Sequence, residues 1–205
     1  MKITETTYKN VAAIECETEK IKVKFLPQNG CRMQSVIDKE TGTEFMALDK
    51  DPDFKPQLLG GSYIEGDVSG CDDMFPTIDP MTFKEGERGG KEYPCHGEVC
   101  RVAHKTEFFD GGFSTYYHSD ELLYGYKKTV CEGENGGVRV TYEIKNEGSE
   151  DFRCMWAAHF MAAAEEGGYA VTPYNDGDKG EIMFDEDGQL GKRNDVFSVP
   201  RSALV

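Results

Sequence analysis

The strongest constraint on the fold is an alternation of apolar and charged residues with a period of two. Residues 21–25 read IKVKF, in which the apolar residues and the lysines take turns. Successive side chains of a β-strand point to opposite faces, so this pattern predicts a strand with one buried face. The sequence PQNG follows at 27–30, and an Asn-Gly pair favours a tight turn because both residues tolerate positive φ. We therefore expect a hairpin whose second strand covers residues 33–37.

The same alternation returns in the second half of the chain. Strands are expected over residues 102–109, 113–117, 122–130, 138–144 and 152–163, separated by turns rich in Gly, Asn and Asp. In the longest of them, one face is expected to hold Leu122, Tyr124, Tyr126, Lys128 and Val130. Neighbouring hairpins of this kind form an antiparallel meander with one solvated face. The sequence predicts an all-β sandwich in one domain over residues 1–205.

One long stretch lacks the alternation. Residues 49–93 are acidic and punctuated by Gly and Pro, with several aromatic residues among them. Long loops in compact domains are commonly functional or disordered, and the aromatic residues favour a packed loop. We expect this segment to be a binding loop.

Charge excludes several classes of function. Lys and Arg total 23 against 38 Asp and Glu, a formal net charge of −15. A nucleic-acid partner and an anionic membrane surface both call for basic residues, so neither is expected. No apolar run approaches the ~20 residues that cross a bilayer, and MKITETTYKN lacks the apolar run of a signal peptide. The lack of such apolar runs predicts a cytoplasmic protein. The seven cysteines are scattered and odd in number, which predicts reduced thiols rather than a disulfide framework.

Three short segments concentrate chemically useful side chains: SGCDDMFP at 69–76, YPCHGE at 93–98 and MWAAHF at 155–160. The candidate site residues that they supply are Asp72, Asp73, His96, Trp156 and His159. Each has an ordinary structural alternative as well. Paired aspartates commonly form turns, and a histidine in a strand is often a hydrogen-bonded core residue.

A metal site is the main alternative chemistry. His96 and Glu98 could chelate one ion, with another histidine or Cys95 and Cys100 completing the set. The spacing matches neither a CxxC pair nor an HExxH helix, and no Gly-x-Ser-x-Gly or phosphate-binding loop is present. No metal or other cofactor is therefore expected.

The order of the segments resembles that of the aldose 1-epimerase (galactose mutarotase-like) superfamily. The run FLPQNGCRMQSVIDKETGTEFM is followed by GCDDMFPTIDP, YPCHGE and CMWAAHFMA, and the resemblance covers about residues 20–175. The chain is most similar to the uncharacterised aldose-epimerase-like branch, since the His-Gly-Gly of the well-known galactose enzymes reads His96-Gly97-Glu98 here. The resemblance implies a β-supersandwich of two large antiparallel sheets with a sugar site on a concave face.

The resemblance also implies a reaction, the interconversion of the anomers of a free hexose by acid/base ring opening. His159 would be the acid at the ring oxygen, and histidine suits that role because its ordinary pKa lies near neutrality. His96 would orient the sugar and share the charge. Asp72, Asp73 and Trp156 would contact sugar hydroxyls and the sugar face.

One feature of the family is not found. Its general base is a glutamate near the C-terminus, and none of Glu165, Glu166, Glu181 and Glu186 matches that motif. A shortened chain, an inactive relative or a base from another chain would each explain this, and we expect C-terminal strands of the sandwich to be missing. The sequence specifies neither the sugar nor the oligomeric state. The alternative functions are a non-catalytic carbohydrate-binding module on the same fold and a metal-dependent β-sandwich enzyme using His96, Glu98 and another histidine.

Overall fold

The computed structural model of this chain describes residues 1–165, 168, 173–183, 185, 188 and 190–199. The chain divides into two compact units, Met1–Ala164 and Glu165–Val205, where the sequence predicted one domain over residues 1–205. The second unit holds a strand pair, β13 (Lys179–Glu181) with β14 (Val196–Ser198). The first unit carries His96 and His159.

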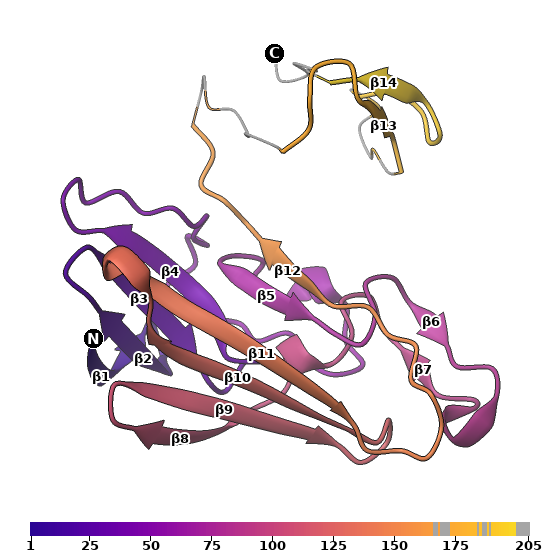
Figure 1. Cartoon of the computed structure of the whole chain (residues 1–205), viewed down its shortest axis with the longest axis horizontal. Helices are drawn as coiled ribbons and strands as arrows, with labels where there is room; N and C mark the ends of the chain where they lie inside the picture. Colours follow the sequence, from indigo (N-terminus) through magenta and orange to yellow (C-terminus); the bar gives the residue numbers. More distant parts are fainter. Residues whose placement is uncertain (166–167, 169–172, 184, 186–187, 189, 200–205) are drawn as a thin grey trace. The chain divides into compact units, whose positions relative to one another are not determined.

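The first unit is built on a six-stranded sheet in the order β1-β2-β3-β4-β5-β12, in which all neighbours are antiparallel. Its strands are β1 (Lys2–Tyr8), β2 (Val11–Glu17), β3 (Ile21–Leu26), β4 (Arg32–Asp38), β5 (Cys71–Met74) and β12 (Ala157–Phe160). Figure 1 shows β5 and β12 side by side at the end of this sheet that lies farthest from β1.

A second sheet has four antiparallel strands in the order β11-β10-β9-β8. These are β8 (Lys105–Phe109), β9 (Gly112–Ser119), β10 (Tyr124–Glu132) and β11 (Val138–Asn146). The smaller elements are β6 (Met81–Thr82) paired with β7 (Glu92–Tyr93), and the 3-10 turns η1 (Tyr63–Glu65), η2 (Gly86–Arg88), η3 (Val99–Arg101) and η4 (Glu134–Gly136). Within the described ranges, no helix is long and apolar enough to cross a membrane.

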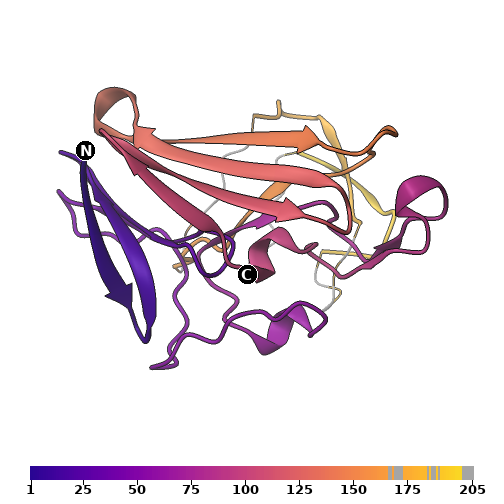
Figure 2. The same ribbon diagram turned by 90° about the horizontal axis from the view of Figure 1, so that it is seen from below.

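The two sheets pack face to face as a sandwich, which confirms the predicted all-β class. Figure 2 shows the four-stranded sheet as one layer and the strands of the six-stranded sheet beneath it. The main core cluster joins both layers, with Ile14, Val23 and Phe25 of one sheet against Phe113 and Val130 of the other. Phe25 and Phe113 meet edge-on, with ring centroids 5.6 Å apart.

Several strands follow the sequence pattern closely. Burial alternates along β10, where Tyr124, Tyr126, Lys128 and Val130 are all buried, as expected. The predicted hairpin over residues 21–37 forms as β3 and β4, and Gly30 in its turn has φ +65°. A Cβ on Gly30 would lie 2.5 Å from the Cα of Cys100, so the turn needs glycine for close approach as well as for its dihedral.

The last predicted strand was wrong in extent and in partner. A strand over 152–163 was expected to continue the meander beside 138–144, but β12 covers only Ala157–Phe160. It crosses to the other sheet, where it pairs with β5. Alternation predicts a strand but not the sheet in which it lies, because either sheet would bury one of its faces.

The segment over 49–93 is packed, and it also contains β5. Its first part covers the face of the six-stranded sheet that points away from the second sheet. Phe54 packs there against Ala13 and Leu26. The buried Arg32 guanidinium of β4 donates to Gln57 Oε1 (2.6 Å) and to the Ser69 carbonyl (3.0 Å) in this segment. This covered face holds the candidate site.

Candidate functional site

The pairing of β5 with β12 places His159 directly opposite Asp72. Asp73, the next residue of β5, contacts the second sheet, so Asp72 and His159 point to the opposite, outer face. The Asp72 side chain is 2% exposed and that of His159 is 29% exposed. His159 Nδ1 lies 3.9 Å from Asp72 Oδ2. A buried carboxylate therefore stands behind a solvent-accessible imidazole.

His96 reaches the same place from a different part of the chain. It lies in the turn between β7 and η3, and its ring centroid is 4.8 Å from that of His159. Its backbone has φ +69° and donates to the Ile78 carbonyl at 2.7 Å. The adjacent Gly97 also has positive φ, and a Cβ there would lie 2.2 Å from the Phe75 carbonyl oxygen. The turn can approach the end of β5 only because residue 97 is glycine.

Tyr63 of η1 lies among these groups, although it was not among the residues predicted from the sequence. Its hydroxyl donates to Asp72 Oδ2 and lies 3.4 Å from His159 Nδ1. Its ring is stacked on His96, with centroids 3.8 Å apart and planes 5° from parallel. Tyr63 is buried. A tyrosine in a loop carries no sequence pattern of its own, so only the fold shows that it belongs to the site.

Arg32 forms an ion pair with Asp72. Arg32 Nε lies 2.7 Å from Asp72 Oδ1, and both side chains are buried. Burial by itself opposes ionisation of Asp72, but the interactions with His159, the Arg32 charge and the Tyr63 hydroxyl outweigh it and lower the pKa of the carboxyl. Asp72 is therefore an ionised acceptor. Arg32 is another residue that sequence reasoning missed, although a polar residue on the apolar face of a strand is a usable signal.

His96 is held as a neutral ring. Burial, together with the neighbouring His159, lowers its pKa to about 4. Its Nδ1 lies 2.9 Å from the Cys95 Sγ, and burial raises the pKa of that thiol. The pair is thus an uncharged thiol beside an uncharged imidazole at neutral pH.

Arg101 joins the two loops that carry Tyr63 and His96. Its guanidinium donates to the carbonyls of Leu58 and Gly61, each at 2.8 Å, and to the Cys95 carbonyl at 2.9 Å. These bonds fix η1 beside the His96 turn. Arg101 follows Cys100 at the end of η3, and no local sequence pattern indicates this role.

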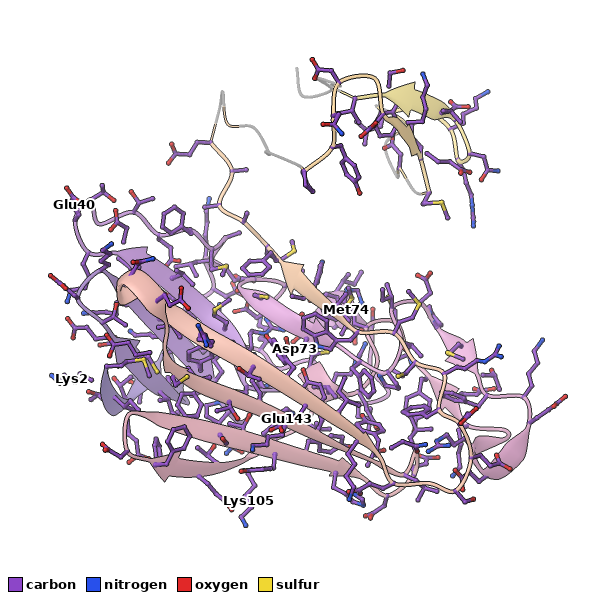
Figure 3. All side chains as sticks on the ribbon, viewed as in Figure 1. Lys2, Glu40, Asp73, Met74, Lys105 and Glu143 are labelled. Carbon is purple, nitrogen blue, oxygen red and sulfur yellow. The ribbon has the colours of Figure 1, made fainter. Side chains whose placement is uncertain are left out.

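The structure does not bring Asp73 to the histidines. Its carboxylate lies between the sheets, 2.8 Å from Lys128 Nζ, and the side chain is fully buried. Figure 3 labels it on β5, beside Met74. Adjacent residues of a strand face opposite ways, so Asp72 and Asp73 cannot both reach one surface. Asp73 is instead part of a buried ion pair inside the sandwich.

Trp156 also lies apart from the histidines. Its Nε1 donates to the Tyr126 hydroxyl at 3.1 Å, and its ring lies 4.7 Å from that of Tyr142. Both partners belong to the second sheet, β10 and β11. Trp156 and His159 are three positions apart, which gives them opposite faces of an extended segment.

Glu98, the remaining acidic candidate of the first unit, has a partner of its own. Among the described residues, no group of three or more His, Cys, Asp or Glu is arranged to hold a metal ion. Glu98 is buried and accepts from the Tyr124 hydroxyl at 2.7 Å. Glu166 and Glu186 lie outside the described residues, and Glu165 and Glu181 belong to the second unit.

The cluster can move protons at an accessible surface. It offers two imidazoles, an ionised carboxylate behind one of them and a hydroxyl between carboxylate and ring. His159 Nε2 makes no hydrogen bond with any described residue, and the side chain that carries it is partly exposed. Such a set suits general acid and base catalysis on an uncharged polar molecule.

No protein-family model and no curated protein matches the chain. One solved structure that matches part of the chain is the 4-alpha-glucanotransferase from Thermococcus litoralis, at a TM-score of 0.43 and 11% sequence identity. The match covers 70% of this chain and 24% of the glucanotransferase, so the chain spans about a quarter of that protein's length. At these values the similarity carries no argument about function.

Proposed function

We propose that this protein is an aldose 1-epimerase-like enzyme that interconverts the anomers of a free hexose. The observation that carries the proposal is the meeting of His96 and His159, 4.8 Å apart, beside an ionised Asp72. The resemblance of the sequence segments to the aldose 1-epimerase superfamily supports the reaction type. The net charge of −15 favours an uncharged substrate over a sugar phosphate.

The reaction needs two proton transfers around C1 of the sugar. A proton leaves the C1 hydroxyl, the bond between C1 and the ring oxygen breaks, and the ring oxygen takes up a proton. In this proposal His159 donates that proton from Nε2, and Asp72 stabilises the imidazolium before transfer. His96 is available to accept the hydroxyl proton, because its pKa of about 4 keeps it unprotonated near neutrality. Rotation about the C1–C2 bond and the reverse transfers then close the other anomer.

The first prediction concerns His159. His159→Ala is expected to lower the catalysed rate of anomer exchange by ~100-fold or more, the usual contribution of a positioned acid or base. Polarimetry on freshly dissolved hexoses measures this rate against the uncatalysed rate in buffer.

His118→Ala is the matched control. His118 is half exposed on β9, where it lies 2.7 Å from Glu147 and 3.0 Å from Asp120. Its substitution by alanine is expected to leave the rate of anomer exchange unchanged. Equal rates for the wild-type protein and for buffer, across a panel of hexoses, would reject the enzymatic proposal.

A second candidate is a carbohydrate-binding module without catalysis. It is favoured by the position of Asp72, which is the carboxylate in contact with His159 but is buried and already bound by Arg32 and Tyr63. This candidate predicts that a hexose binds, in calorimetry, with no effect on anomer exchange. Trp156 fluorescence is not a direct reporter for such binding, because Trp156 contacts the second sheet.

A further inference from the structure

The Tyr63 hydroxyl lies between Asp72 and His159 and has no part in the reaction described so far. It donates to Asp72 Oδ2 and is 3.4 Å from His159 Nδ1. The direct separation of His159 Nδ1 from Asp72 Oδ2 is 3.9 Å, which is too long for a hydrogen bond. Any hydrogen-bonded link between the carboxylate and the imidazole therefore passes through the hydroxyl.

The number of available protons fixes the direction of this link. An ionised carboxylate only accepts hydrogen bonds, and a tyrosine hydroxyl has one proton to donate. Asp72 is ionised beside Arg32, so the Tyr63 proton is directed to Asp72. The Tyr63 oxygen is then an acceptor toward His159, whose Nδ1 must carry a proton to complete the chain. Burial and the nearby Asp72 raise the pKa of Tyr63, so it keeps its proton throughout the neutral range.

We propose that the Tyr63 hydroxyl is a relay that couples the Asp72 carboxylate to His159, fixing its Nδ1–H tautomer and leaving Nε2 as the basic, proton-exchanging nitrogen. The reaction that Nε2 performs rests on the proposed function, whereas the tautomer rests on these contacts alone. Tyr63 is a positioning residue in this arrangement, since it is buried and acts through the imidazole.

The ring of Tyr63 has a separate role from its hydroxyl. It stacks on His96 at 3.8 Å and 5°, while Arg101 lies 5.9 Å from the same ring. Tyr63→Phe keeps this stack and removes only the relay, and Tyr63→Leu removes both. Comparing the two variants therefore distinguishes the effect of the hydroxyl on the His159 tautomer from the effect of the ring on the position of His96.

The second prediction is tested by NMR spectroscopy on full-length protein with ¹⁵N-histidine. Long-range ¹H–¹⁵N correlations report which ring nitrogen is protonated in neutral His159, and no ligand is needed. The wild-type protein is expected to show protonated Nδ1, and Tyr63→Phe to shift His159 toward protonated Nε2. In the same variant kcat for anomer exchange is expected to fall by ~10-fold or more with little change in KM.

Tyr8→Phe is the matched control. Tyr8 is partly buried, and its hydroxyl accepts a hydrogen bond from Gln34 Nε2 at 3.4 Å without touching either site histidine. This variant is expected to leave the His159 tautomer as in the wild type.

The outcomes separate the relay from the reaction. Protonated Nε2 on His159 in the wild type, or an unchanged tautomer in folded Tyr63→Phe, would overturn the relay whatever the activity. The expected tautomer change in a protein with no effect on any hexose would support the relay and reject the proposed reaction. Circular dichroism and thermal melting establish that each variant is folded.

Discussion

Asp73 and Lys128 form an ion pair that is buried between the two sheets. The Lys128 ammonium is 2.8 Å from Asp73 Oδ2 and 2.9 Å from the Cys31 carbonyl oxygen, and both side chains of the pair are at most 1% exposed. Removing one partner of a buried pair leaves the other charge without compensation, which is more costly than removing both. Substituting one or both partners of this pair therefore tests whether Asp73 is a structural residue of the sandwich.

The third prediction follows at this scale. Asp73→Asn is expected to lower the free energy of unfolding by ~3–5 kcal/mol, and Lys128→Met in the same chain to restore most of it. Urea unfolding measures both changes. Lys127→Met is the control, since Lys127 is only partly buried on the other face of β10, where it pairs with Glu143 at 2.9 Å. The Asp73→Asn variant losing less than ~1 kcal/mol would contradict the buried pairing.

The sequence pointed to the two histidines, His96 and His159, that the structure brings together. It also placed Asp72 and Asp73 in one site, although they face opposite sides of the strand. Asp72 and Asp73 are adjacent in a strand, and Trp156 is an odd number of positions from His159, so strand geometry alone separates each pair. If β5 and β12 are known to be strands, their alternation excludes Trp156 and one of the two aspartates from the face that carries His159. The sequence does not tell which aspartate is excluded, because either face of β5 could be the inner one.

At the scale of elements, the site depends on two loops and two short strands. β5 and β12 supply Asp72 and His159, η1 supplies Tyr63, and the turn after β7 supplies His96. Arg101 ties the two loops by its three hydrogen bonds to carbonyl groups. A planar guanidinium reaches several carbonyls at once, which a lysine ammonium on a flexible chain does not reproduce.

The fourth prediction concerns that tie. Arg101→Lys is expected to speed hydrogen exchange of the backbone amides of residues 58–66 and to reduce anomer exchange, because η1 is released from the His96 turn. Mass spectrometry of exchanged peptides measures the first effect. Arg139→Lys, an exposed position paired with Glu134 at 3.0 Å, is expected to change neither. Unaltered exchange over residues 58–66 in Arg101→Lys would show that another contact holds η1.

Local sequence patterns predict some of these elements but not others. The β3–β4 hairpin and the meander of β8 to β11 follow from local alternation and turn residues, and both form. β12 was placed in the wrong sheet because nothing local specifies its partner. The segment over 49–93 was expected to be a loop, and its strand β5 was not found, since SGCDDMFP has no alternation of apolar and polar residues.

At the scale of the whole molecule, two histidines link folding to pH. His104 is buried between the sheets, with Nε2 3.2 Å from the Val99 carbonyl oxygen, and burial together with Lys128 lowers its pKa to about 3. Between pH 6.5 and that value the unfolded chain binds a proton that the folded protein does not. Stability therefore falls as the pH falls through this window. His96, with a pKa of about 4, has the same sign over a narrower window.

The fifth prediction isolates His104. The free energy of unfolding of the wild type is expected to decrease from pH 6.5 to 5, with His104 contributing up to ~1.4 kcal/mol per pH unit. His104→Gln keeps a hydrogen-bonding side chain but has no group that titrates here, so its unfolding free energy is expected to depend less on pH. Urea unfolding at several pH values measures the slope. Equal slopes for the two proteins would mean that His104 is protonated in the folded state.

The sequence by itself determined the class of the fold and the faces of its regular strands. Alternation and turn residues are local properties, so the all-β class and the buried row along β10 can be derived from neighbouring residues alone. The tertiary structure decided which strands are neighbours and which loops cover them. It placed β12 beside β5, and therefore His159 opposite Asp72, and it brought Tyr63 and Arg32 to that carboxylate. The contacts of Asp72 with His159 and with Arg32 join residues far apart in the chain. They depend on how the sheets and loops pack together rather than on any short stretch of sequence.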